Sequence, residues 1–274
     1  MGFILKLAIS NIIWSKGKEK FPGFLDAVAE SGIGGVELAL NAIFEEPVSL
    51  SDGELIALQQ AIAKRGLLVS ALHSLTFTRG DLELFGDKKK RGALLDYLTE
   101  YVRIALLLKC DNLVFGSPSA RKMRGRNKAE CDNVFLEFLA SLDSSLGNIS
   151  LNIEPLHPAM CEYLHSLKEA RELIKMGNLQ NIKVQLDLRS CIENDESPDE
   201  IRSSLPFVTH CQVSDPGLVG IADTYGQKHE MFAAILRDST YSGFVAGEML
   251  PAVGKNDDEA LRDAVGSMRK YYGR

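Results

Sequence analysis

The chain has 274 residues, of which 45% are hydrophobic and 25% are charged, and its formal net charge is −6. This is the composition of a globular protein with a sizeable core, and it argues against disorder. The acidic balance gives no general attraction to nucleic acid or to an anionic membrane, so we expect small-molecule partners. No apolar run approaches the ~20 residues that span a bilayer, and the first residues lack a signal-peptide pattern, so we expect a cytoplasmic protein.

Eight short apolar, β-rich runs alternate with helical patterns along the chain. The runs cover residues 5–14, 34–40, 67–75, 111–118, 149–157, 182–190, 207–215 and 243–250. Between them, apolar residues recur at three- and four-residue spacing, which predicts amphipathic helices. The clearest such pattern is residues 91–108, where Leu94, Leu98 and Tyr101 share one stripe.

Helix boundaries are also marked in the sequence. Ser51 and Ser197 stand where N-caps are expected, and Gly32, Gly66 and Gly177 stand where a left-handed residue closes a helix. Five cysteines lie singly along the chain with no C-x-x-C pair. That spacing argues against disulfides and against a cysteine zinc site, so we expect small core residues.

Strict alternation of strands and helices predicts a parallel sheet, because parallel neighbours need a crossover connection. Eight such units favour an α/β fold of the (β/α)8 TIM barrel type over an open sheet. No Pro-, Gly- or Ser-rich linker divides the chain, so we expect residues 1–274 to form a single domain.

Polar and ionisable side chains occur on the expected strands, and many of them lie near the carboxyl ends, where the active site of such a barrel lies. They are Glu37, His73, Asn152, Glu154, Gln185, Asp187, His210, Gln212 and Glu248. Carboxylates within apolar strands are costly to bury unless they are paired, hydrogen-bonded or bound to a cation. If Glu154, Asp187 and Glu248 converge, their mutual repulsion indicates a divalent ion.

Four motifs, LNIEPLH (151–157), VQLDLRS (184–190), HCQVSD (210–215) and GEML (247–250), follow each other at expected strand ends. Together they resemble the xylose isomerase-like sugar phosphate isomerase/epimerase superfamily of TIM barrels, over nearly the whole chain. The resemblance implies a cytoplasmic, metal-dependent isomerase or epimerase acting on a sugar or sugar phosphate. It does not specify the substrate.

The resemblance places the metal ligands at Glu154, Asp187, Gln212 and Glu248. Gln212 stands where the family usually has a histidine. An amide oxygen with three carboxylates makes an all-oxygen site, which favours Mn²⁺ or Mg²⁺ over Zn²⁺. Two further positions depart from the family: Ser190 replaces a histidine and Met160 replaces a second glutamate, and both changes affect substrate contacts more than the metal.

The resemblance also implies that Glu154 and Glu248 are the catalytic pair. One carboxylate would take a proton from carbon and the other would return it, through an enediolate. A hydride shift is the open alternative. The candidate substrate-binding residues are Glu37, His73, His157, Arg189, Trp14 and Arg121.

Several of these residues have a structural alternative. Glu37 is expected to act as a buried hydrogen-bond acceptor rather than a substrate contact. For His73, contact with the substrate and a buried, hydrogen-bonded role are equally expected. Trp14 would form a wall of the pocket. Arg121 belongs to a basic loop, residues 119–128, which could capture a phosphate or remain a solvated segment.

Two other functions remain open. A DNA-repair endonuclease of the same barrel type is disfavoured, because its trinuclear zinc site needs more histidines than the five present. A barrel that binds a sugar or related ligand without turnover is the stronger alternative, given Gln212, Ser190 and Met160. The sequence leaves open whether the protein forms a homo-oligomer.

Overall fold

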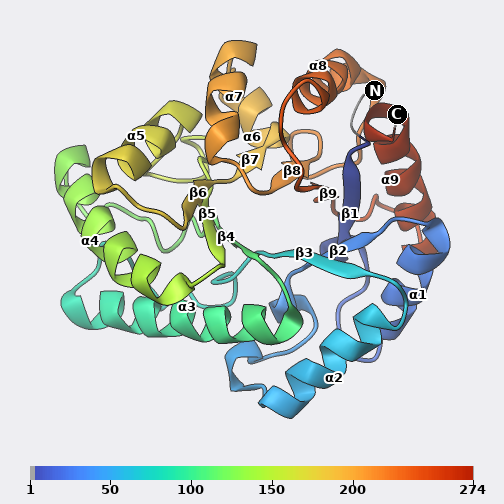
Figure 1. Cartoon of the computed structure of the whole chain (residues 1–274), viewed down its shortest axis with the longest axis horizontal. Coiled ribbons are helices and arrows are strands. Elements are labelled where there is room, and N and C mark those ends of the chain that lie inside the picture. Colours follow the sequence, from blue (N-terminus) through green and yellow to red (C-terminus); the bar gives the residue numbers. More distant parts are fainter. Residues whose placement is uncertain (1–3, 274) are drawn as a thin grey trace.

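The computed structural model describes residues 4–273, in which strands and helices alternate along the chain (Figure 1). The strands are β1 (Lys6–Ser10), β2 (Gly35–Leu38), β3 (Leu68–Leu72), β4 (Asn112–Phe115), β5 (Ser150–Ile153), β6 (Ile182–Val184), β7 (Leu186–Asp187), β8 (Cys211–Val213) and β9 (Phe244–Gly247). Each of the eight apolar runs contains a strand. The expected TIM barrel is therefore confirmed.

Nine helices are assigned over the same residues, and they surround the strands in Figure 1. They are α1 (Phe21–Ser31), α2 (Asp52–Ala63), α3 (Lys88–Leu108), α4 (Lys128–Leu146), α5 (Leu167–Gly177), α6 (Leu188–Glu193), α7 (Pro198–Ser204), α8 (Gly226–Arg237) and α9 (Asp257–Tyr272). The expected stripe of α3, Leu94, Leu98 and Tyr101, is buried. None of the helices in this part of the chain is long and apolar enough to cross a membrane.

The strands are parallel and run in the order β6-β5-β4-β3-β2-β1-β9-β8-β7. β6 and β7 are two pieces of one strand, divided at Gln185. The backbone N–H of Gln185 donates to the carbonyl of Ile153 in β5 (3.0 Å). The backbone N–H of the next residue, Leu186, donates instead to the carbonyl of His210 (3.5 Å). The sixth strand therefore changes partners at Gln185, and the sheet closes nearly completely into a barrel.

The expected helix caps are largely confirmed. Ser51 accepts a hydrogen bond from the backbone N–H of Glu54 in a capping box. The side chain of Ser197 caps α7 by accepting from a backbone N–H in its first turn. Gly32 and Gly66 both have φ of +73°, the left-handed conformation that glycine adopts without steric cost.

The prediction for Gly177 is wrong. Gly177 is the last residue of α5, and the left-handed residue is Asn178, with φ of +48°. Asparagine tolerates this conformation better than most residues. Gly177 instead allows close packing, because a Cβ there would lie 2.8 Å from the Cδ2 atom of Leu136.

Each predicted run is longer than the strand that it contains, and in two of them the difference affects site residues. The run 182–190 ends as a strand at Asp187 and continues as α6, because the Asp187 side chain caps that helix by accepting from the N–H of Arg189. The run 207–215 is a strand only over Cys211–Val213, so His210 lies just before β8. All five cysteines are buried and unpaired, as expected.

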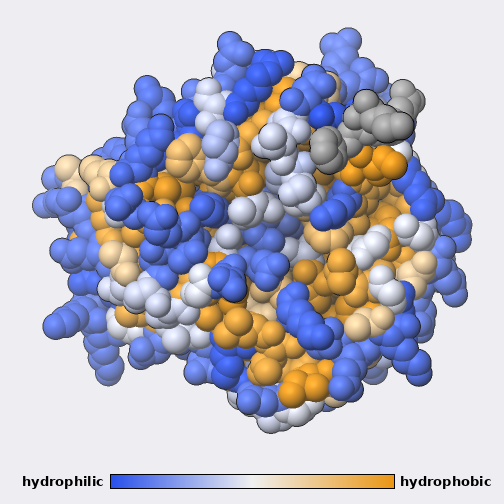
Figure 2. Space-filling view, viewed as in Figure 1, coloured by the Kyte–Doolittle hydropathy of each residue, from blue (hydrophilic) through white to orange (hydrophobic). Residues whose placement is uncertain are grey.

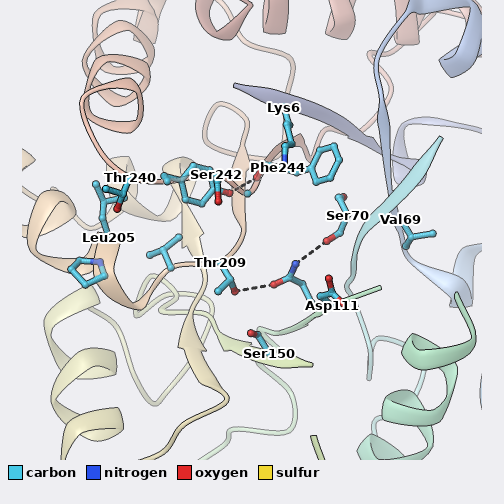
Figure 3. A pocket seen from close by; sticks show the side chains of 15 residues that line it. Lys6, Val69, Ser70, Asp111, Ser150, Leu205, Thr209, Thr240, Ser242 and Phe244 are labelled. Atoms are coloured by element: carbon cyan, nitrogen blue, oxygen red, sulfur yellow. Dashed lines mark hydrogen bonds between the residues drawn. The ribbon is translucent and has the colours of Figure 1, made fainter. Parts of the chain in front are cut away.

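The interior of the barrel is polar, and hydrophilic side chains show at the centre of the face in Figure 2. At the amino-terminal ends of the strands, the Oγ1 atom of Thr209 lies 2.8 Å from side-chain oxygens of both Asn112 and Asn152. An open cavity of about 480 Å³ lies at this end, with Lys6 and Asp111 among its lining residues (Figure 3). Its buried polar side chains have partners within the chain. The carboxylates Glu154 and Glu248 line a pocket at the opposite end of the strands.

Candidate functional site

A pocket of about 370 Å³ lies at the carboxyl ends of the strands. Five of the expected site residues line it: His73, Glu154, Arg189, Gln212 and Glu248. The rest of the lining comes mainly from the segments that follow β3, β4 and β5, together with Val114 in β4 and Leu218 after β8. Its apolar side chains include Phe77, Leu156 and Met160. A concave, partly apolar site with a few convergent polar groups is typical of small-molecule binding.

Arg189 folds back onto Asp187 within one turn of chain. The Nε atom of Arg189 lies 3.2 Å and the Nη2 atom 3.0 Å from the Oδ2 atom of Asp187. The backbone N–H of Arg189 donates to Oδ1 (3.0 Å), and the hydroxyl of Ser190 donates to Oδ2 (3.0 Å). Both oxygens of Asp187 are thus engaged by donors from the first turn of α6.

The same guanidinium reaches Glu154 at the end of β5. The Nη2 atom of Arg189 lies 3.4 Å from Oε1 of Glu154, and both residues are buried. Burial and the nearby charge of Asp187 outweigh Arg189 and raise the pKa of Glu154 to about 8. Gly116, just after β4, leaves room for this carboxyl group, since a Cβ there would lie 2.2 Å from Oε2.

Glu248 and His73 form a second pair across the pocket. The Nδ1 atom of His73 lies 3.1 Å from Oε1 of Glu248, and its Nε2 atom lies 2.7 Å from the hydroxyl of Ser10. Burial opposes the charged imidazole of His73, but Glu37 and Glu248 outweigh it and raise its pKa to about 9. His73 is therefore an imidazolium at neutral pH, in contact with Glu248.

Glu37 lies beneath the pocket floor and organises a hydrogen-bond network. Its Oε1 atom accepts from Nε2 of Gln212 (3.0 Å) and contacts Nε2 of His210 (2.7 Å). The Oε1 atom of Gln212 in turn accepts from Nε2 of Gln185 (2.8 Å). His210 and Gln212 therefore share one face of the chain to bind a buried carboxylate, and the expectation of a buried acceptor at Glu37 is met by this geometry.

The four expected metal ligands are not arranged to hold an ion. Both oxygens of Asp187, the amide oxygen of Gln212 and one oxygen each of Glu154 and Glu248 already contact protein donors. Arg189 already supplies a positive charge to two of them. Over residues 4–273, no three His, Cys, Asp or Glu side chains are spaced as metal ligands. The residues present do not fit a divalent ion in this arrangement.

Four predicted substrate-binding residues do not line the pocket: Glu37, Trp14, His157 and Arg121. Trp14 is half-buried and packs its ring edge-on against Phe24. The Nδ1 atom of His157 accepts from the backbone N–H of Ala159 (3.2 Å). The structure does not bring either residue to the carboxylates.

Arg121 is fully buried behind the pocket. Its Nη1 atom donates to the carbonyl of Tyr163 (3.3 Å), and burial lowers its pKa. Two other cations of the basic loop are paired: Arg124 binds Glu83, and the Lys128 side chain binds a carboxylate one turn along α4. The protein's own carboxylates therefore neutralise part of the positive charge of this loop.

Sequence reasoning missed two features of the site. Ser10, which holds His73, ends the first strand, and its position at a strand end was the signal that could have identified it. The contact between Met160 and Arg189, with Sδ 3.4 Å from Nη1, had no such signal, because the direction of a loop side chain cannot be read from spacing.

Comparison with known proteins identifies the fold family. The family model described as xylose isomerase-like TIM barrel matches residues 25–271. Among solved structures, a D-psicose 3-epimerase in the presence of D-fructose has a TM-score of 0.80 at 20% identity, covering 98% of this chain and 100% of that one. The 3-keto-D-glucoside 4-epimerase YcjR from E. coli has a TM-score of 0.78 at 16% identity, covering 97% and 99%.

A third similar structure is the IOLI protein, whose structure contains a bound zinc atom. Its TM-score is 0.73 at 16% identity, covering 98% of this chain and 100% of that one. A comparison with curated protein sequences gives no match. The structural similarities establish the barrel, and the family model spans most of the sequence. The chain therefore belongs to the xylose isomerase-like TIM barrel family.

Proposed function

We propose that the chain is an isomerase or epimerase of a sugar or sugar phosphate, in which Glu154 and Glu248 exchange protons with the substrate. The observation that carries the proposal is that these two carboxyl groups line one pocket but have different partners. Similar structures include epimerases of sugars, one of them obtained in the presence of D-fructose. The metal dependence implied by the family resemblance is not part of the proposal, because the expected ligands are engaged by protein donors.

The different surroundings of the two carboxyl groups assign their roles. Glu154, with a pKa of about 8, carries a proton at neutral pH and acts as the acid. Glu248 contacts the His73 imidazolium at 3.1 Å and acts as the base. Separation of the protonation states of two neighbouring carboxyl groups is a common basis for acid–base catalysis at neutral pH.

The reaction follows from these roles. Glu248 removes a proton from the carbon beside the carbonyl group, while Glu154 gives its proton to the carbonyl oxygen, which leaves a neutral enediol. For the isomer, Glu248 gives its proton to the neighbouring carbon while the hydroxyl on the first carbon loses its proton to Glu154 and becomes the new carbonyl. For the epimer, Glu154 takes back the proton of the enediol hydroxyl and delivers it to the opposite face of the first carbon, and exchange with solvent then moves the proton of Glu248 back to Glu154. The protein ends either reaction with its original protonation states.

Solvent exchange tests this proposal. The protein would be incubated with ketoses and ketose phosphates in D₂O, and deuterium at the carbon beside the carbonyl group would be followed by NMR. We expect exchange with at least one sugar, and Glu154→Gln or Glu248→Gln should slow it by about 10²–10⁴-fold. Glu137→Gln, which changes an exposed carboxylate on α4, is the matched control and should leave exchange unchanged.

Exchange at the wild-type rate in both pocket variants would contradict the proposal. A ligand-binding barrel without turnover is the second candidate, and the contacts of Ser190 favour it: its hydroxyl binds Asp187 where the family has a histidine for substrate. Saturation-transfer NMR that detects a bound sugar, with no deuterium incorporated, would support this second function.

A further inference from the structure

The cation between the pocket carboxylates comes from the chain itself. Arg189 is 4% exposed, and its guanidinium group contacts Asp187 and Glu154 from one position. An arginine side chain does not lose its proton in proteins. The guanidinium is therefore charged.

The fixed geometry of this cation comes from local sequence. Asp187 ends β7 and caps α6, and Arg189 lies two residues later, in the first turn of that helix. The turn that places the backbone N–H of Arg189 on Oδ1 of Asp187 also returns its side chain to Oδ2. The carboxylate and its counter-charge are thus positioned by the same turn.

A guanidinium in this position and a divalent ion exclude each other. A bound Mg²⁺ needs its oxygen ligands at about 2.0–2.1 Å. Asp187 and Glu154 instead hold the Nη2 atom of Arg189 at 3.0 and 3.4 Å. An ion between them would overlap with the guanidinium group and would be repelled by its positive charge. Binding of the ion would require the Arg189 side chain to leave a buried site.

One side of the guanidinium is left for a ligand. The Nη1 atom donates to the Sδ atom of Met160 at 3.4 Å, and a thioether is a weak acceptor. The nearest carboxylate oxygen recorded for Nη1, Oε2 of Glu193, lies 3.9 Å away, beyond hydrogen-bonding distance. Arg189 and Met160 both line the pocket, so an oxygen atom of a ligand there can replace the sulfur contact.

We propose that Arg189 takes the place of the divalent ion in this barrel: it neutralises Asp187, contacts the carboxyl group of Glu154, excludes a metal, and presents Nη1 to a ligand oxygen. Only the last part rests on the proposed function. The exclusion of a metal concerns the resting protein and is tested without substrate or turnover, so its failure and the failure of the proposed reaction are separate results.

Calorimetric titration of Mn²⁺ into EDTA-stripped protein is the test. We expect no binding heat from the wild type and binding at least about tenfold tighter, into the measurable range, in Arg189→Ala, because Asp187 then loses its counter-charge and the space beside Asp187 and Glu154 opens. Arg171→Ala is the matched control: Arg171 pairs with Glu200 on the outer helices α5 and α7, and its loss should leave the wild-type result unchanged.

Arg189→Met, which keeps much of the side-chain length without the charge, is the second variant if the alanine protein does not fold. Wild-type melting curves with EDTA and with Mn²⁺ add a measurement that needs no variant, and we expect them to coincide. Micromolar binding of Mn²⁺ by the wild type that Asp187→Asn abolishes would overturn the proposal. Absence of binding in folded variants would also overturn it, since Arg189 would then not be what excludes the metal.

Discussion

The carboxyl group of Glu154 lies between the backbone after β4 and the guanidinium of Arg189. Gly116 allows this approach, because any other residue would place a Cβ within 2.2 Å of Oε2. The atom displaced is the end of a flexible side chain, so the backbone need not move. The carboxyl group would instead turn away from Arg189.

Gly116→Ala should therefore reduce activity much more than stability. We expect deuterium exchange into the substrate to fall by about 10²-fold, because a displaced acid no longer reaches the carbonyl oxygen. The unfolding free energy, measured in urea, should change by less than about 1 kcal/mol. Gly92→Ala, at a helical position with open space around it, is the control. A large loss of stability with normal exchange would contradict this account of Glu154.

The raised pKa of Glu154 also predicts how stability depends on pH. The folded protein holds this proton up to about pH 8, whereas the unfolded chain releases it near pH 4.5. The contribution of Glu154 to stability is thus fully present below pH 4.5 and is lost as pH rises through about 8. His73 adds a loss of the same sign between pH 6.5 and about 9.

Urea unfolding of wild type and Glu154→Gln across this range checks the prediction. Because glutamine does not titrate, the unfolding free energy of wild type should fall relative to that of the variant by a few kcal/mol between pH 4.5 and 8. Parallel curves for the two proteins would show that the folded pKa of Glu154 is not raised.

At the scale of elements, the junction of β7 and α6 carries both a helix cap and a buried ion pair. Asp187→Asn keeps a capping side chain but removes the charge opposite Arg189. Loss of one partner of a buried pair typically costs about 3–5 kcal/mol. We expect a loss of that order in thermal or urea unfolding at neutral pH.

The chain offers a matched exposed pair as the control. Asp199 contacts Arg202 at 3.1 Å on α7, and the Asp199 side chain is 94% exposed. Exposed pairs of this kind contribute little, so Asp199→Asn should cost less than about 1 kcal/mol. Equal effects of the two substitutions would mean that the pair of Asp187 and Arg189 is solvated in solution.

These elements show what the sequence predicted and what it did not. Periodicity located all eight strand positions and the outer helices, because each element buries one face and repeats at its own period. It predicted one strand over 182–190, since Leu186 and Leu188 continue the apolar alternation. The cap formed by Asp187 depends on the direction that the chain takes in the folded protein, which the alternation does not encode. The strand-end carboxylates were likewise identified, whereas the path of the Arg189 side chain among them was not.

At the scale of the whole molecule, a buried cluster links the last helices to the barrel. His229 on α8 contacts the hydroxyl of Tyr272 on α9 through Nδ1 (2.6 Å) and Oδ1 of Asp215, after β8, through Nε2 (2.9 Å). Burial lowers the pKa of His229 despite the nearby Asp215. The imidazole is thus favoured in its neutral form, which donates to one partner and accepts from the other.

Tyr272→Phe should destabilise the whole barrel by about 1–3 kcal/mol, because it leaves a buried imidazole nitrogen without its partner. Differential scanning calorimetry would measure this as a lower melting temperature with a single transition. Tyr225→Phe, outside the cluster, is the control and should have a smaller effect. An unchanged melting temperature in Tyr272→Phe would show that α9 does not depend on this contact.

The central claim is that Arg189 is the cation of a sugar pocket formed by Glu154, Asp187 and Glu248. A crystal structure of protein grown with Mn²⁺ and a bound ketose, with diffraction measured at the manganese absorption edge, tests it most directly. The account predicts no anomalous peak among the three carboxylates and a sugar oxygen within hydrogen-bonding distance of Nη1. A manganese peak bound by Glu154, Asp187 and Glu248, with Arg189 turned out of the pocket, would contradict it.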